Sequence, residues 1–194
     1  MTDDNMKTYP VVPGANIQLE HLPSEAKDAA MGRYMDVFGR LEGMVHLAIG
    51  LTMEIDLMAM GSVFAVLGTK QSIDLLEAVA QEHLTKEGAR RVHLLGVRLG
   101  NANRRRNHIV HGSWAMAVLI TDEQVTQEWV RTYSHVDPAL RKLPYNDPKV
   151  AGTYTFTVPA LDTTSGHVEA LCQAIGALIE DLPSLRLPPQ AAQE

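Results

Sequence analysis

The sequence contains few of the residues that build disulfide-bonded, aromatic-rich or membrane-spanning proteins. Cys172 is the only cysteine among 194 residues, so no internal disulfide can form, which agrees with a reducing compartment. Aromatic residues make up 5% of the chain, so Leu, Val, Ile, Ala and Met must fill the core, which favours interdigitated helices. No apolar run reaches the roughly 18 residues of a membrane span, and no secretory leader opens the chain. We therefore expect a cytoplasmic protein without a membrane partner.

Acidic residues outnumber basic residues, and the net charge of -6 argues against a protein that coats nucleic acid through its overall field. The basic residues are nevertheless concentrated between residues 86 and 106, where Glu87 is the only acid. A local basic strip of this kind can hold a phosphate backbone even on an acidic protein. The alternative is a solvated helix face. The strip consists of Lys86, Arg90, Arg91, Arg98, Arg104, Arg105 and Arg106.

The length and the apolar content of 45% predict one domain with a sizeable core. Residues 1–22 are broken by proline and glycine and show no sustained period, so we expect a flexible arm there. The domain itself is expected to span residues 23–182, and residues 183–194 are expected to form a tail. We find no internal repeat and no low-complexity block.

Apolar residues recur at helical spacing over most of the chain. A long helix is predicted after the N-cap candidate Ser24, a second from Thr69 or Ser72, a third from about Lys86 to Ile109, and a last one ending before Pro183. Residues 61–68 form an apolar stretch that ends in a turn. The predicted buried positions are Tyr34, Phe38, Leu41, Val45, Ala48, Leu51 and Ile55; Ile73, Leu76, Val79 and Ala80; Val92, Leu95, Leu99, Ala102 and Ile109; Leu161, Val168, Leu171, Ile175, Leu178 and Ile179.

The pattern changes between residues 114 and 158. Two apolar or β-branched runs, 114–120 and 125–133, are separated by four polar residues and predict a β-hairpin. A proline-containing loop follows, and residues 154–158 predict a short third strand. The predicted fold class is therefore mainly α, a bundle of four to five helices, with a small hairpin or three-strand insertion before the last helix.

The most informative segment runs from Arg104 to Trp114 and reads RRRNHIVHGSW. It places three guanidiniums, a carboxamide and two imidazoles at a predicted helix end. A guanidinium presents a planar fork of donors that matches phosphate oxygens, and an imidazole exchanges protons near neutrality. Arg106 falls on the edge of the apolar stripe, so we expect it to face a cleft, a partner subunit or a ligand, because an unpaired buried charge is costly. Together these groups indicate phosphodiester chemistry.

Within this segment, Arg106, Asn107, His111 and Gly112 resemble the signature of the HEPN family, the higher eukaryote and prokaryote nucleotide-binding domains. That signature is an arginine, a polar residue that is often asparagine, and a histidine a few positions later. Arg106 matches the arginine, Asn107 the polar neighbour and His111 the histidine. The motif also lies at the end of an inner helix, with a long helix before it and another at the carboxyl end.

The resemblance implies a metal-independent endoribonuclease that works as a homodimer and needs no cofactor. It also implies that the protein could be a toxin or defence component, whose activity an antitoxin or another regulatory protein restrains. His111 would be the general acid or base, Arg106 would stabilise charge on the phosphate, and Asn107 would orient His111 or the RNA. The 2'-hydroxyl of RNA would be the nucleophile. Further substrate contacts would come from Arg98, Arg104, Arg105 and His108.

Other roles for these residues stay open. His111 could interact with carbonyl groups at a helix C-terminus, and Arg106 could bridge subunits or cap the bundle. His108 and His111 have a spacing that suits a metal ion, but no third ligand is evident, so no metal site is predicted. The chain could also be an inactive dimeric module that binds RNA, a nucleotide or a protein, or a plain helical scaffold.

Overall fold

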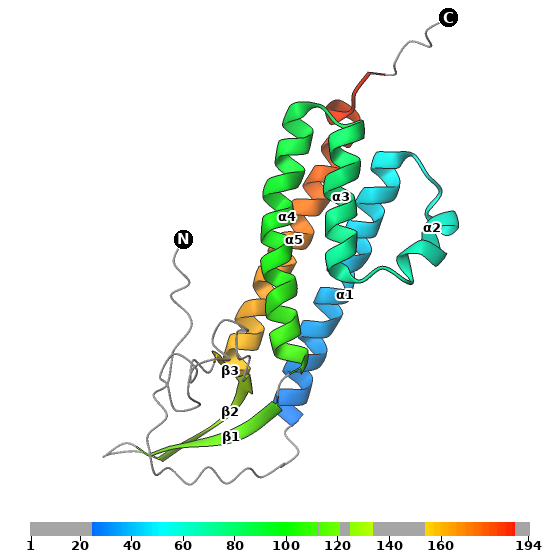
Figure 1. Cartoon of the computed structure of the whole chain (residues 1–194). Coiled ribbons are helices and arrows are strands. Elements are labelled where there is room, and N and C mark those ends of the chain that lie inside the picture. The colour runs from blue at the N-terminus through cyan, green and yellow to red at the C-terminus, as the bar shows by residue number, and fades with distance from the viewer. Residues whose placement is uncertain (1–24, 112, 121–124, 134–153, 189–194) are drawn as a thin grey trace, which may run out of the picture. The chain divides into compact units, whose positions relative to one another are not determined.

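The computed structural model describes residues 25–111, 113–120, 125–133 and 154–188 (Figure 1). The expected arm at residues 1–22, the loop before the third strand and the end of the tail lie outside these ranges. The described residues form five helices and three strands, and the prediction of a mainly helical bundle is confirmed. None of these helices is both long enough and apolar enough to cross a membrane. The elements are α1 (Glu25–Met53), α2 (Leu57–Phe64), α3 (Thr69–His83), α4 (Lys86–His111), β1 (Ser113–Ile120), β2 (Val125–Tyr133), β3 (Tyr154–Thr157) and α5 (Val158–Leu185).

The chain divides into two compact units. The first unit contains the start of α1, the end of α4, the three strands and the start of α5. The second unit contains the rest of α1, all of α2 and α3, most of α4 and the rest of α5. The boundaries fall at residues 34, 106 and 164, so three long helices contribute to both units.

In the first unit the three strands form an antiparallel sheet in the order β1-β2-β3. Ser113 of β1 pairs with Thr132 of β2, and Val130 of β2 pairs with Thr157 of β3.

In the second unit apolar stripes of α1, α3, α4 and α5 form the core. Over both units, the predicted buried faces of α3 and α4 are confirmed at every predicted position, as are those of α1 up to Ala48 and of α5 up to Leu178. Of these positions, Tyr34, Ile109 and Leu161 belong to the first unit. Leu51 and Ile55 were predicted to be buried, and this is wrong, because 37% and 36% of their surfaces are exposed. The stripe of α1 instead continues through Ile49 and Thr52, and the helix ends before Ile55 is reached.

The segment after α1 contains a short helix that the sequence pattern did not predict. Glu54 has a φ of 58°, in the left-handed region, and this residue ends α1. Asp56 then caps α2 by accepting a hydrogen bond of 2.9 Å from the backbone N–H of Met58. Residues 57–64 are apolar almost throughout, so they show no helical period from which a helix could be recognised.

The final helix extends further than predicted, because α5 passes through Pro183 and ends at Leu185. A proline inside a helix removes one backbone hydrogen bond and crowds the preceding turn. Here Pro183 is exposed and lies in the last turn, while Leu182 and Leu185 on either side of it are buried. Burial of these two leucines keeps the last turn helical.

Candidate functional site

All of the residues from Arg104 to His111 lie on one helix, α4 (Figure 1). We call these eight residues the α4 motif. The buried stripe of α4 includes Leu99, Ala102 and Ile109, which anchors the helix on one side. The polar residues of the motif therefore project from the remaining faces. Gly112 lies outside the described residues.

The last two turns of α4 carry the amide and the two imidazoles of the α4 motif, all in the first unit. Asn107 and His111 are exposed, and His108 is half-buried. Asn107 and His111 are four residues apart, a spacing that places two side chains on the same face of a helix. His111 is in the last turn, where the helix dipole favours a positive charge. The exposed imidazole is therefore accessible to a ligand on this face.

Arg106 belongs to the second unit and is half-buried. Its guanidinium carbon lies 5.8 Å from the ring centroid of Phe38, a fully buried residue of α1. A planar cation over an aromatic face is attracted by the electrons of the ring. This contact with α1 accounts for an arginine at the edge of the apolar stripe.

Two arginines near the start of α4, Arg90 and Arg91, are paired with acids. Arg90 donates two hydrogen bonds of 3.0 Å to Glu87, one turn earlier, and Arg90 thereby lowers the pKa of Glu87. Arg91 donates a hydrogen bond of 2.8 Å to Asp181 of α5. These two arginines therefore add little free positive charge to the surface.

Arg98 and Arg104, further along α4, are not paired in this way. Both are exposed, and neither has a carboxylate partner within the described part of the chain. Arg104 donates a hydrogen bond of 2.5 Å to the side-chain oxygen of Asn101, which carries no charge. Uncompensated positive charge on α4 is therefore found at Arg98 and Arg104.

The predicted site residues are thus divided between the two units. The first unit contains Asn107, His108 and His111. The second contains Arg98, Arg104, Arg105 and Arg106, of which Arg105 and Arg106 are half-buried. Over the described ranges, no three His, Cys, Asp or Glu side chains gather as metal ligands.

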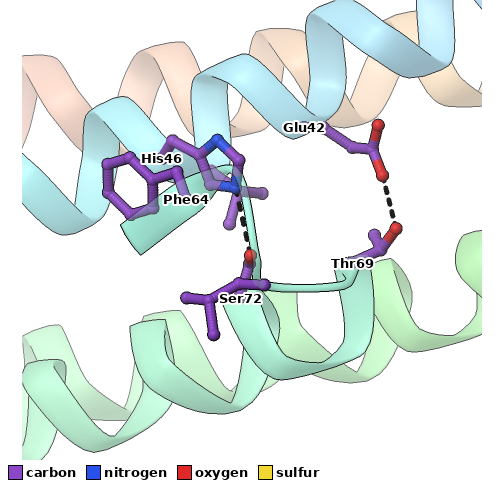
Figure 2. A pocket seen from close by; sticks show the side chains of 7 residues that line it. Glu42, His46, Phe64, Thr69 and Ser72 are labelled. Atoms are coloured by element: carbon purple, nitrogen blue, oxygen red, sulfur yellow. Dashed lines mark hydrogen bonds between the residues drawn. The ribbon is translucent and has the colours of Figure 1, made fainter. Parts of the chain in front are cut away.

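Sequence reasoning missed a second group of polar side chains, which surrounds a cavity of about 160 Å³ in the second unit (Figure 2). His46 of α1 and Ser72 of α3 are hydrogen-bonded, with 3.0 Å between Nε2 and Oγ. The carboxylate of Glu42, one turn before His46, accepts a hydrogen bond from the hydroxyl of Thr69. The cavity is lined by Glu42, Val45, His46, Phe64, Leu67, Thr69 and Ser72.

The only signal in the sequence for this group is the spacing within each helix. Glu42 and His46 are four residues apart, and Thr69 and Ser72 are three apart, so each pair lies on one helix face. Nothing in the sequence indicates that these two faces meet.

Comparisons with protein-family models, with curated proteins and with solved structures found no match to this chain.

Proposed function

We propose that this chain is a metal-independent endoribonuclease with a HEPN-like fold, which acts as a homodimer through the C-terminal half of α4. One observation carries the proposal: Asn107 and His111 are exposed on one face of a helix that also carries the exposed arginines Arg98 and Arg104, which have no carboxylate partner in the described part of the chain. Such a helix attracts a phosphate backbone, and an exposed imidazole can move a proton near neutral pH.

The reaction proposed is attack by the 2'-oxygen of RNA on the adjacent phosphorus. The bond from phosphorus to the 5'-oxygen of the next nucleotide breaks, which leaves a 2',3'-cyclic phosphate and a 5'-hydroxyl. One group must remove the proton of the 2'-hydroxyl, and another must protonate the leaving oxygen. We assign one of these steps to His111 and the other to His111 of the second copy, so the reaction needs no metal ion.

The remaining residues of the α4 motif hold the substrate. Arg106 would stabilise the negative charge that develops on the phosphoryl oxygens, as a fixed guanidinium does in other phosphate sites. Asn107 would orient His111 or the RNA, since an amide both donates and accepts hydrogen bonds. Neighbouring phosphates would be bound by Arg98, Arg104, Arg105 and His108.

The test is digestion of single-stranded RNA by the purified chain in the presence of a chelator. We expect products that end in a 2',3'-cyclic phosphate, whereas DNA of the same base sequence stays intact because it lacks the 2'-hydroxyl. His111→Ala should lower the cleavage rate by about 10²-fold or more, the usual contribution of a general acid or base. The matched control is His83→Ala, which removes an exposed imidazole from the last turn of α3.

Three other results would overturn the proposal. RNA that stays intact but binds with a steep dependence on salt would indicate a binding module. RNA that is neither cleaved nor bound would indicate a helical scaffold. A monomer in light scattering would contradict a site that needs His111 from two copies. If the chain does cleave RNA, control of that damage by an antitoxin or another regulatory protein becomes the next question.

A further inference from the structure

The cavity beside α2 has one formal charge on its wall, the carboxylate of Glu42. No Lys or Arg lines it. Burial lowers the pKa of His46, and this outweighs the opposite effect of the nearby Glu42, so the imidazole is neutral at physiological pH. The interior of the cavity is therefore negative.

Glu42 has no cationic partner within the described residues. Its carboxylate accepts a hydrogen bond from the neutral hydroxyl of Thr69, although a carboxylate can accept about four. A half-buried carboxylate without a cation is poorly compensated, because it has lost part of its water shell.

Within residues 25–111 and 158–188, the other acids without an ion-pair partner differ from Glu42 in their surroundings. All four of them are exposed on the surface, where water compensates the charge. Glu42 is the half-buried member of this set, and its side chain lies at the wall of a cavity (Figure 2). The four exposed acids are Glu25, Asp56, Glu82 and Glu180.

The rest of the cavity wall is apolar or already hydrogen-bonded. Phe64 stacks on the ring of His46, with 4.2 Å between the centroids and 5° between the planes. Ser72 is hydrogen-bonded to His46. Val45 and Leu67 complete the apolar side. A ligand here would meet one negative group and a short apolar wall.

The volume limits the size of such a ligand. A space of about 160 Å³ corresponds to roughly five water molecules at about 30 Å³ each. Drug-sized ligands occupy pockets of about 300–1,000 Å³, so the cavity suits a much smaller molecule.

We propose that this cavity binds a small primary ammonium compound, with the ammonium group donating to Glu42 and a short alkyl part against Phe64 and Leu67. An anion would be repelled by Glu42. A metal ion would find only one carboxylate and one imidazole at the wall, and that imidazole is already bonded to Ser72. The proposal is independent of the α4 motif, since no residue of that motif lines the cavity.

The experiment compares three probes of the same length and different charge: n-butylammonium, n-butanol and butyrate. Binding is followed by two-dimensional NMR of the natural chain, through the backbone amide signals of Thr69 and Ser72. We expect n-butylammonium to shift these signals saturably, n-butanol to bind about tenfold more weakly, which corresponds to about 1.4 kcal/mol, and butyrate not to bind.

Two variants test the assignment to Glu42. Glu42→Gln preserves the shape of the side chain but removes its charge, so its affinity for n-butylammonium should fall to that of n-butanol. Glu82→Gln removes an exposed carboxylate from α3 and should bind like the natural chain. The three-probe series needs only the natural chain, so it decides the question even if Glu42→Gln does not fold.

The proposal is overturned by equal binding of n-butanol and n-butylammonium, which would indicate a simple apolar cavity. It is equally overturned if none of the three probes shifts the two amide signals, or if zinc binds there and displaces n-butylammonium.

Discussion

The ring of His46 and the hydroxyl of Ser72 connect α1 to the start of α3 through a hydrogen bond of 3.0 Å. Only 2% of the surface of Ser72 is exposed, and Phe64 covers one face of the imidazole. Ser72 is therefore almost inaccessible to bulk water, whereas His46 is half-buried. A hydrogen bond of this kind is costly to break, because the remaining group is left without a partner.

The first prediction follows from this bond. Ser72→Ala should lower the free energy of unfolding by about 1 kcal/mol, because Nε2 of His46 loses its hydrogen-bond partner. Urea denaturation measures the change. The control is Ser62→Ala, which alters an exposed serine of α2 and should change stability by less than about 0.5 kcal/mol. Equal effects of the two substitutions would contradict a stabilising role for the bond.

The second prediction concerns pH. The pKa of folded His46 lies below its ordinary value of 6.5, so the unfolded chain binds a proton more readily than the folded chain. The stability that depends on neutral His46 is therefore fully present above pH 6.5 and is lost as the pH falls from 6.5 toward the folded pKa. Urea midpoints across this window measure it. His46→Gln should lose less stability than the natural chain as the pH falls, and the difference between the two isolates His46 from the other histidines. An identical dependence of stability on pH in both proteins would contradict the prediction.

The third prediction compares two glycines of α4. A Cβ at Gly88 would lie 2.9 Å from Cβ of Leu84 and 3.2 Å from Cβ of Leu185, whereas a Cβ at Gly100 meets nothing within 4 Å. Gly100→Ala should therefore stabilise the helix by about 0.5–1 kcal/mol, the usual difference between these residues. Gly88→Ala should destabilise the protein by about 1–3 kcal/mol through overpacking. Thermal unfolding measures both changes. A higher melting temperature for both variants would contradict the predicted overpacking, because it would mean that the side chain of Leu185 moves aside at little cost.

The fourth prediction separates structure from RNA contact on α4. Arg106→Lys keeps the charge but replaces the planar group above Phe38, so stability should fall by at least about 0.5 kcal/mol. Arg98→Lys, at an exposed position, should leave the melting temperature unchanged. Circular dichroism melts provide the measurement. Equal melting temperatures for both variants would mean that the Phe38 contact contributes nothing.

A matched RNA-binding assay completes this comparison. Arg98→Ala should weaken binding of RNA and reduce its dependence on salt, because one phosphate contact is lost. If binding is unchanged at every salt concentration, Arg98 does not touch the RNA.

Much of the helical architecture could be predicted because each amphipathic helix repeats its own pattern. The buried positions of α3 and α4, from Ile73 to Ile109, follow from a period of about 3.6 residues that needs no knowledge of any other segment. The helix α2 could not be recognised in this way, since its residues are apolar on nearly all faces. The predicted end of α5 before Pro183 was wrong for a different reason. The local tendency of proline to end a helix was outweighed by the burial of Leu182 and Leu185.

The two candidate sites differ in the same way: one follows from the local sequence and the other from tertiary packing. The α4 motif is a run of adjacent residues, so the order of the chain was sufficient to show its guanidiniums and imidazoles at a helix end. The cavity depends on His46 and Ser72, which are 26 residues apart and meet through the packing of α1 against α3. Amino-acid order specifies which face of each helix is polar, but the packing of the apolar core selects which polar faces come together, and long-range contacts of that kind have no periodic signature in the sequence.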